Sequence, residues 1–152
     1  MEDSGLLRQQ KIELSPCSEI EPHIKHWLKQ RQALLVIFSQ LCESNRAKSD
    51  KLHTFCQSLV DYLSTGHFQM FEKLAQAQAA YLPHSKGLDG NILDSISQTT
   101  DFALDFNDKY TDPKSLTDLS RDLSLLGENL ANRMDWEDNL IKNYWNISSQ
   151  VH

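Results

Sequence analysis

Apolar residues recur at alternating intervals of four and three along four segments of the chain. This interval is typical of an amphipathic α-helix that buries one face. The first such helix is predicted from about Glu21 to Cys42. Ser18 and Glu21 are spaced as a capping box, and Pro22 suits a first helical turn. The stripe that this helix is expected to bury, which one arginine interrupts, is Ile20, Ile24, Trp27, Arg31, Leu34, Phe38 and Leu41.

A second helix is predicted from Ser49 or Asp50 toward Tyr81, where Pro83 and nearby glycines end it. Its stripe is Leu52, Cys56, Leu59, Leu63, Gly66, Met70, Leu74, Ala77 and Tyr81. Gly66 thus falls on the buried side. A glycine there permits close approach of another helix, although it weakens its own helix by about 1 kcal/mol relative to alanine.

Two further helices are predicted in the second half of the chain. The third opens at Asp89 or Asn91, with the stripe Ile92, Ile96, Thr99, Ala103, Phe106 and Tyr110. Asp112 as N-cap and Pro113 at the first helical position predict that the fourth helix begins directly after the third. Its stripe is Leu116, Leu119, Leu123, Leu126, Leu130, Arg133, Glu137, Leu140, Tyr144, Ile147 and Val151.

Four helices with seams near 3.5 residues favour an all-α antiparallel four-helix bundle. We expect residues 1–18 to form a short, loosely ordered N-terminal arm and residues 19–152 to form a single helical-bundle domain. Composition supports this fold class. The chain has 22 leucines but 3 valines, and 5 glycines with 4 prolines. Sheet proteins need β-branched residues in their strands and glycine or proline in their turns, so the composition argues against an all-β fold and against an α/β fold.

The charge is distributed unevenly along the chain. Residues 1–76 are neutral overall, whereas residues 77–152 carry the whole net charge of −6. An acidic half disfavours direct nucleic-acid binding, which requires Lys and Arg to displace counterions from phosphates. It suits a basic partner instead.

Cysteine usage and hydropathy indicate a cytoplasmic protein. Cys17, Cys42 and Cys56 are odd in number and widely spaced, which supports neither a disulfide framework nor a zinc site. We expect no secretory leader and no membrane span, because no charged segment precedes an apolar run and no apolar run approaches 18 residues.

Motifs for enzymatic chemistry are missing from the sequence. The Glu-x-x-His pairs of di-iron bundles, HExxH, phosphate-binding glycine loops and a nucleophile elbow are all absent. His84 lies in a predicted loop and is unsuited to phosphotransfer, and the pair His23 and His26 lacks a third metal ligand. We therefore predict a non-enzymatic protein with no cofactor, no metal and no catalytic residue.

Charged residues interrupt the apolar stripes at three positions, Arg31, Arg133 and Glu137. Arg133 and Glu137 are four residues apart and can pair along one helix. A buried charge must be paired and hydrogen-bonded. The three residues are therefore interpreted as a structural polar layer that fixes helix register, or as groups that face a groove and contact a partner.

The side of the second helix opposite its stripe carries an unusual mixture. An aromatic residue stands there among carboxylates and hydroxyls, in the set Asp61, Ser64, Thr65, Phe68 and Glu72. An apolar anchor ringed by polar groups has the anatomy of a protein-binding hot spot. This surface is our candidate for contact with a partner.

The segment FCQSLVDYLSTGHF, Phe55 to Phe68, resembles the regulator of sigma D family, the Rsd/AlgQ anti-sigma factors of bacteria. The similarity covers most of residues 24–75 and 120–142, including Trp27, Arg31 and Arg133. The resemblance implies an all-helical bundle that binds the primary, housekeeping sigma factor of RNA polymerase. The family engages the C-terminal domain of sigma, which reads the −35 promoter element, and so blocks contacts with polymerase and promoter.

The resemblance also implies the site residues. Asp61, Ser64 and Phe68 match the family's contact helix, which implies that Asp61 pairs with a basic residue of sigma and Phe68 enters an apolar pocket. Trp27 and Arg31 also match, although their stripe positions allow a structural role. The alternative is a helical adaptor that binds a signalling protein, such as a phosphotransferase-system carrier or an alarmone enzyme.

Overall fold

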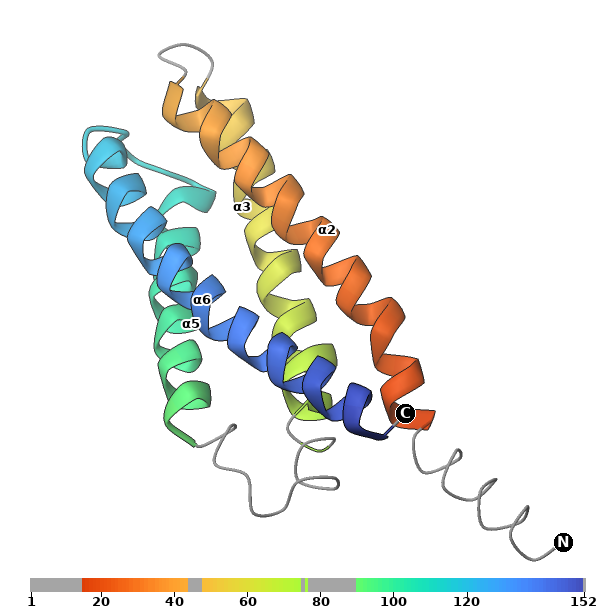
Figure 1. Ribbon diagram of the computed structural model, residues 1–152. Coiled ribbons are helices and arrows are strands. Elements are labelled where there is room, and N and C mark those ends of the chain that lie inside the picture. The colour runs from red at the N-terminus through yellow and green to blue at the C-terminus, as the bar shows by residue number, and fades with distance from the viewer. Residues whose placement is uncertain (1–14, 44–47, 75, 77–89, 152) are drawn as a thin grey trace, which may run out of the picture.

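The structure is a computed structural model that describes residues 15–43, 48–74, 76 and 90–151. Four long helices make up most of these residues (Figure 1). They are α2 (Ser15–Glu43), α3 (Lys48–Thr65), α5 (Gly90–Thr111) and α6 (Leu119–Val151). A short π-helix, η1 (Gly66–Met70), continues α3. The all-α fold class predicted from the sequence is confirmed.

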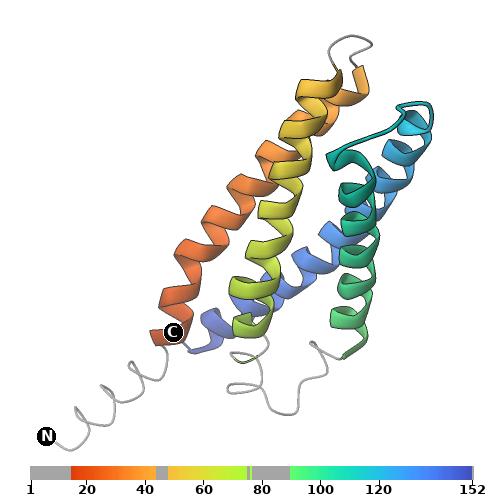
Figure 2. The same cartoon turned by 180° about the vertical axis from the view of Figure 1, so that it is seen from behind.

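The helices alternate in direction around the bundle. α2 packs along α3, α3 packs against α5, and α5 packs against α6. α6 runs obliquely across the molecule and returns to contact α2, as Figures 1 and 2 show from opposite sides. Each helix therefore presents its apolar stripe to two neighbours, which is the arrangement expected of an antiparallel four-helix bundle.

The core consists largely of the predicted stripe residues. Twenty-one of their apolar side chains are almost inaccessible to solvent: Ile20, Ile24, Trp27, Leu34, Leu41, Leu52, Cys56, Leu59, Leu63, Met70, Leu74, Ile96, Ala103, Phe106, Tyr110, Leu119, Leu123, Leu126, Leu130, Leu140 and Tyr144. Aromatic pairs connect the helices. Trp27 stacks on Tyr62 with ring centroids 5.9 Å apart, and Phe55 meets Phe106 edge to face at 6.0 Å. Such pairs stabilise the fold beyond the area they bury.

The first helix begins earlier than the sequence predicted. α2 starts at Ser15 and not near Glu21, so it includes the last residues of the expected arm, and the proposed capping box lies inside the helix. Pro22 is likewise internal, on the exposed side, where water can hydrate the carbonyl group that a proline leaves without its amide donor. Burial of Ile20 favours this extra length.

The last helix begins later than predicted. α6 starts at Leu119, and residues 112–118 form the connection from α5. The Ser115 hydroxyl accepts a hydrogen bond from the Thr117 amide at 3.2 Å, and the Leu119 amide donates to the Leu116 carbonyl at 3.2 Å. These local bonds compete with helix formation after Pro113. Leu116, expected in the buried stripe, is exposed.

A widened turn interrupts the second helix. The Phe71 amide donates to the Gly66 carbonyl, the i to i+5 bond of a π-helix, and α-helical residues continue to Leu74. The extra residue rotates the rest of the helix by about one position, so Phe71, outside the predicted stripe, is buried. The predicted continuation through Ala77 to Tyr81, Pro83 and the loop with His84 lies outside the described residues.

An ionic cluster joins the end of α5 to the first turn of α6. Lys109 Nζ lies 2.7 Å from Asp122 Oδ2, and the Tyr110 hydroxyl donates to the same oxygen at 2.5 Å. The hydrogen bonds from Lys109 and Tyr110 lower the pKa of Asp122 to about 2. Burial, together with the bond to Asp122, raises the pKa of Tyr110 to about 12. The cluster thus favours the ionised form of the Asp122 side chain over its protonated form.

The Asp122→Asn variant tests this cluster through pH. A carboxylate whose folded pKa is lowered contributes its stability above the unfolded value of about 3.9 and loses it as pH falls toward 2. We expect the variant to be less stable by about 1 kcal/mol at pH 7, and the difference in melting temperature to shrink between pH 5 and pH 2.5. Asp105→Asn, an exposed change on α5, is the control. A difference that stays constant with pH would contradict the role of the carboxylate.

Candidate functional site

A buried ionic network lies at the centre of the bundle, around the fully buried carboxylate of Glu137 on α6. Arg133 Nε donates to Glu137 Oε2 at 2.9 Å, so the pair expected at positions i and i+4 is present. Arg31 Nη2 of α2 lies 3.1 Å from Glu137 Oε1, and the Tyr62 hydroxyl of α3 donates to the same oxygen. One carboxylate therefore ties three helices together.

Arg31 connects this network to the surface. Its Nη1 lies 2.7 Å from Oδ1 of the exposed Asp138, and its guanidinium stands 5.8 Å from the ring centroid of Trp27. Although burial alone would lower the pKa of Arg31, the oxygens of Tyr62, Asp138 and Glu137 raise it, so the side chain is charged. Arg31 is 13 % exposed, which leaves little of it for direct contact with a partner.

Arg133 extends the network to α5. Its Nη1 donates to Thr100 Oγ1 at 2.6 Å, to Thr99 Oγ1 at 3.0 Å and to the Ile96 carbonyl at 3.3 Å. Its Nη2 has no hydrogen-bond partner among the described residues. With Arg133 included, side chains from all four long helices meet in one polar layer.

The network balances its charges internally. Burial raises the pKa of Glu137, while the two guanidinium groups and the Tyr62 hydroxyl oppose that shift by favouring the carboxylate. Burial also raises the pKa of Tyr62, with the nearby Glu137 adding to the shift, so Tyr62 keeps its proton and donates it. Removing one member of such a buried set leaves another charge unpaired, which costs about 3–5 kcal/mol.

Gly66 lies where the widened turn of α3 and η1 passes over Arg133. A β-carbon at Gly66 would stand 3.0 Å from Phe71 Cζ and 3.4 Å from Arg133 Nη2. Phe71 is itself held edge to face against Trp27 at 5.5 Å and against the Arg133 guanidinium at 5.4 Å. The close approach therefore requires a glycine, and its surroundings have little room to move.

We expect Gly66→Ala to lower the free energy of unfolding by about 1–2 kcal/mol, because overpacking outweighs the gain in helix propensity. Gly127→Ala is the matched control. There the new β-carbon would also meet a ring atom at 3.0 Å, but Phe38 is only half-buried and can turn aside. Chemical denaturation of both variants measures the difference. Equal stability of the two would contradict the tight packing over Arg133.

The exposed side of α3 carries part of the predicted contact surface. Asp61 is exposed and Ser64 is half-buried, one turn apart. Glu72, beyond η1, is exposed, and its carboxylate lies 3.5 Å from Gln76 Nε2. Phe68 belongs to η1, but its side chain lies outside the described residues.

Two residues require a correction to the predicted contact surface. Trp27 has no accessible surface, because it packs between Tyr62 and Phe71. Thr65 is also buried, and its hydroxyl donates to the Asp61 carbonyl at 3.0 Å. Thr65 lies on the same flank of α3 as Tyr62, which packs against Trp27 of α2, and not on the exposed face. Neither side chain can contact a partner in this conformation.

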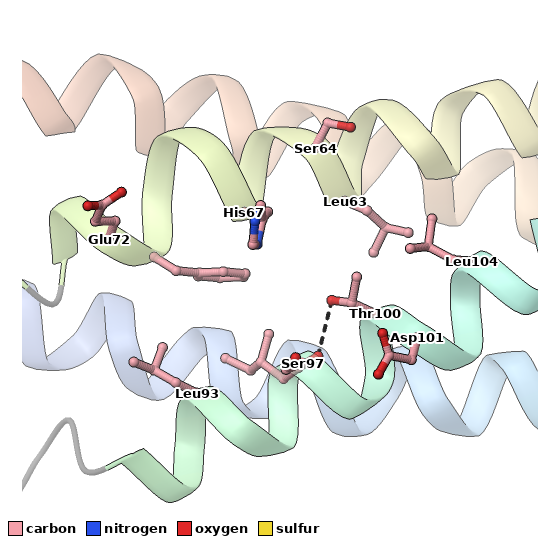
Figure 3. A pocket seen from close by; sticks show the side chains of 11 residues that line it. Leu63, Ser64, His67, Glu72, Leu93, Ser97, Thr100, Asp101 and Leu104 are labelled. Carbon is pink, nitrogen blue, oxygen red and sulfur yellow. Dashed lines mark hydrogen bonds between the residues drawn. The ribbon is translucent and has the colours of Figure 1, made fainter.

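A groove of about 870 Å³ opens between α3 with η1 on one side and α5 on the other (Figure 3). Its apolar lining is Leu63, Phe71, Leu93, Ile96 and Leu104. Polar side chains surround this lining: Ser64, His67, Glu72, Ser97, Thr100 and Asp101. An apolar depression with a few converging polar groups is the usual form of a binding site.

The groove joins the predicted contact surface to the buried network. Ser64 and Glu72 of the predicted surface line its α3 side. Thr100 and Ile96 line its α5 side, and both receive hydrogen bonds from Arg133. The surface, the groove and the ionic layer are therefore one continuous structure.

The described residues contain no group of three or more His, Cys, Asp or Glu side chains placed to hold a metal ion. None of the helices in this part of the chain is long and apolar enough to cross a membrane. Cys56 is buried, and burial raises the pKa of its thiol to about 11, which makes it a poor nucleophile.

Comparison with known proteins identifies the family of this chain. Residues 7–144 match the family described as "Regulator of RNA polymerase sigma(70) subunit, Rsd/AlgQ". The chain belongs to the Rsd/AlgQ family. The match spans α2, α3, η1, α5 and most of α6, so the network and the groove both fall within the Rsd/AlgQ region. The resemblance seen in the sequence is thereby confirmed.

Individual relatives carry the name "Regulator of sigma D". One from Pectobacterium atrosepticum is 32 % identical over 130 residues, covering 78 % of this chain and 85 % of the relative. One from Yersinia pseudotuberculosis is 31 % identical, covering 78 % and 77 %. One from Yersinia enterocolitica is 32 % identical over 131 residues, covering 78 % of each.

Several residues of this candidate site were not predicted from the sequence. Tyr62 and Thr100 complete the ionic network, and Leu104 with Phe71 lines the groove. Leu104 carried a signal, since it is a large apolar residue off the predicted stripe of its helix. Phe71 could not be placed, because the π-turn that reorients it leaves no mark in the apolar spacing.

Proposed function

We propose that this Rsd/AlgQ protein is an anti-sigma factor that binds the primary sigma factor of bacterial RNA polymerase, mainly its C-terminal domain. Its family is described as a regulator of the sigma(70) subunit, and similar proteins are named regulators of sigma D. The observation that carries the proposal is the exposed face of α3, where Asp61 lies one turn before Ser64, and Ser64 lines an open apolar groove. A charged rim beside an apolar centre is the anatomy of a protein interface.

The residues have distinct roles in this proposal. Asp61, exposed on α3, pairs with a basic residue of sigma, and Ser64 and Glu72 offer further hydrogen-bond acceptors. Phe68, on η1, enters an apolar pocket of sigma. The −35-reading domain must itself be basic to contact promoter phosphates. An acidic contact surface therefore competes for the side chains that the promoter and the polymerase would otherwise engage.

The buried network supports this surface from within. Arg133 and Glu137 hold α5 and α6 in register, and Arg31 and Tyr62 attach α2 and α3 to them. We propose that these residues keep the contact face rigid, so that binding requires little ordering of the free protein. In this role Arg31 positions the surface and does not itself form it.

We place the protein in the cytoplasm, where RNA polymerase works, and assign it no catalytic reaction. Binding and sequestration need only surface complementarity and concentration. They leave the sigma factor chemically unchanged.

A pull-down from bacterial lysate with the tagged chain tests the proposal. Recovery of the primary sigma factor as the main partner is expected, together with its loss for Asp61→Lys. Recovery of a signalling protein, such as a phosphotransferase-system carrier or an alarmone enzyme, with no sigma factor would contradict the proposal and favour an adaptor function.

A further inference from the structure

We infer that the groove between α3 with η1 and α5 seats an apolar side chain of the sigma C-terminal domain, while the exposed carboxylates of α5 hold basic residues around it. This inference rests on the proposed function and extends the contact surface from one helix to two. It assigns α5 a role in binding that the pattern along the second helix did not indicate.

The groove has an apolar centre that remains accessible to solvent. Leu104 is 39 % exposed at one end of the α5 wall, and Leu93 is half-buried at the opposite end of that wall (Figure 3). Figure 3 shows Leu63 of α3 facing Leu104, with His67 of η1 pointing into the same space. When a partner covers apolar side chains that are exposed in a depression, the free energy of the complex is lowered.

The groove is also held open in advance. Its α5 wall includes Thr100 and Ile96, which Arg133 fixes through bonds of 2.6 Å and 3.3 Å. Its opposite wall includes Phe71, which packs against Trp27 and against the same guanidinium. A preformed site saves the free energy that ordering two mobile walls would require.

The charge around the groove specifies the chemistry of its occupant. Asp94, Asp101, Asp105 and Asp108 are all exposed along α5, and Asp101 lines the groove itself. Glu72 stands on the other side. Within α5 the single basic residue is Lys109, which is paired with Asp118 and Asp122. This carboxylate field attracts a partner whose apolar anchor is flanked by Lys or Arg.

Other occupants are less compatible with this field. A second copy of the chain would bring its own net charge of −6 to an acidic rim, so like charges would oppose the contact. A phosphate-bearing ligand would meet the same repulsion. A basic DNA-reading domain is the complementary case.

The experiment titrates the full chain, labelled at leucine and isoleucine methyl groups, with the purified C-terminal domain of the primary sigma factor. We expect the methyl resonances of Leu63, Leu93, Ile96 and Leu104 to shift or broaden, while those of the exposed Leu116 and Leu125 remain unchanged. Shifts confined to the remote methyl groups would overturn the inference.

Paired variants test the same point by affinity. Leu104→Gln and Asp101→Lys should each weaken binding at least 10-fold, with unchanged melting temperature because both sites are exposed. Their controls, Leu125→Gln and Glu128→Lys, change an exposed leucine and an exposed carboxylate on α6 and should alter affinity less than 3-fold. Binding by the groove variants equal to that of the controls would overturn the role of the groove.

The two proposals fail in different ways. If the unaltered chain does not bind the sigma domain at all, the proposed function is wrong and this inference falls with it. If the unaltered chain binds, and Asp61→Lys does not, but the groove variants and groove methyl groups behave as controls, the function stands and the groove assignment alone is overturned.

Discussion

Arg133→Ala is expected to lower the free energy of unfolding by about 3–5 kcal/mol, because it leaves the buried carboxylate of Glu137 without its closest cation. For a chain of this size the loss corresponds to about 10 °C in melting temperature. The hydrogen bonds to Thr99 and Thr100 disappear at the same time, so α5 loses its attachment to the layer. Thermal unfolding followed by circular dichroism measures the effect.

Two further variants isolate the buried charge as the cause. Arg121→Ala removes an arginine that is 65 % exposed on the same helix and should change stability by about 0.5 kcal/mol or less. The double variant Arg133→Ala with Glu137→Ala should lose less than the sum of the two single variants, because no stranded carboxylate remains. Strict additivity, or a single variant that melts like the unaltered chain, would show that the pair is not a coupled buried layer.

Asp61→Lys is expected to abolish binding to the primary sigma factor while leaving the fold intact. The change replaces an attraction to a basic partner by a repulsion, which should weaken binding at least 100-fold, or about 2.7 kcal/mol. Asp61 is exposed, so stability should change by about 0.5 kcal/mol or less. Calorimetric titration measures the affinity, and circular dichroism verifies the fold.

Glu128→Lys is the matched control for this variant, since it makes the same change in net charge at an exposed position on α6. If both variants lost affinity equally, net charge and not a specific contact would account for the effect. If Asp61→Lys bound normally, the contact surface would lie elsewhere on the molecule.

Most of the helical core was predictable from spacing alone. Leu123, Leu126 and Leu130 repeat on one face of α6, and burying that face is the dominant source of stability. Helix ends were less predictable. Pro113 suits a first turn on intrinsic preference, but the hydroxyl of Ser115 offers the backbone a competing local bond. Pro22 shows the converse case. Proline is a poor helix former, but the stability gained by burying Ile20 outweighs its cost, so the helix continues through both residues.

The candidate site was predictable in position but not in detail. Period 3.6 places Asp61 and Ser64 away from the buried stripe, and the structure leaves both accessible. The helical period could not show that the Thr65 hydroxyl donates to the backbone, or that Tyr62 and Thr100 complete the buried network. These contacts join residues far apart in the chain, and a single sequence carries no direct signal for them.

The groove likewise could not be predicted from the sequence, because it forms only where α3 with η1 packs against α5. Its formation depends on a π-turn that rotates Phe71 into contact with Trp27 and Arg133. Apolar spacing on either side of such a turn reads as one continuous helix. Widened turns of this kind are frequent at functional sites.

The most direct test of the anti-sigma function is a calorimetric titration of the purified chain with the purified C-terminal domain of the primary sigma factor. We predict a saturable complex of one chain with one sigma domain, formed by the unaltered protein and by Glu128→Lys and lost in Asp61→Lys. Absence of binding by the unaltered protein, in conditions where its helical fold is intact, would contradict the central claim.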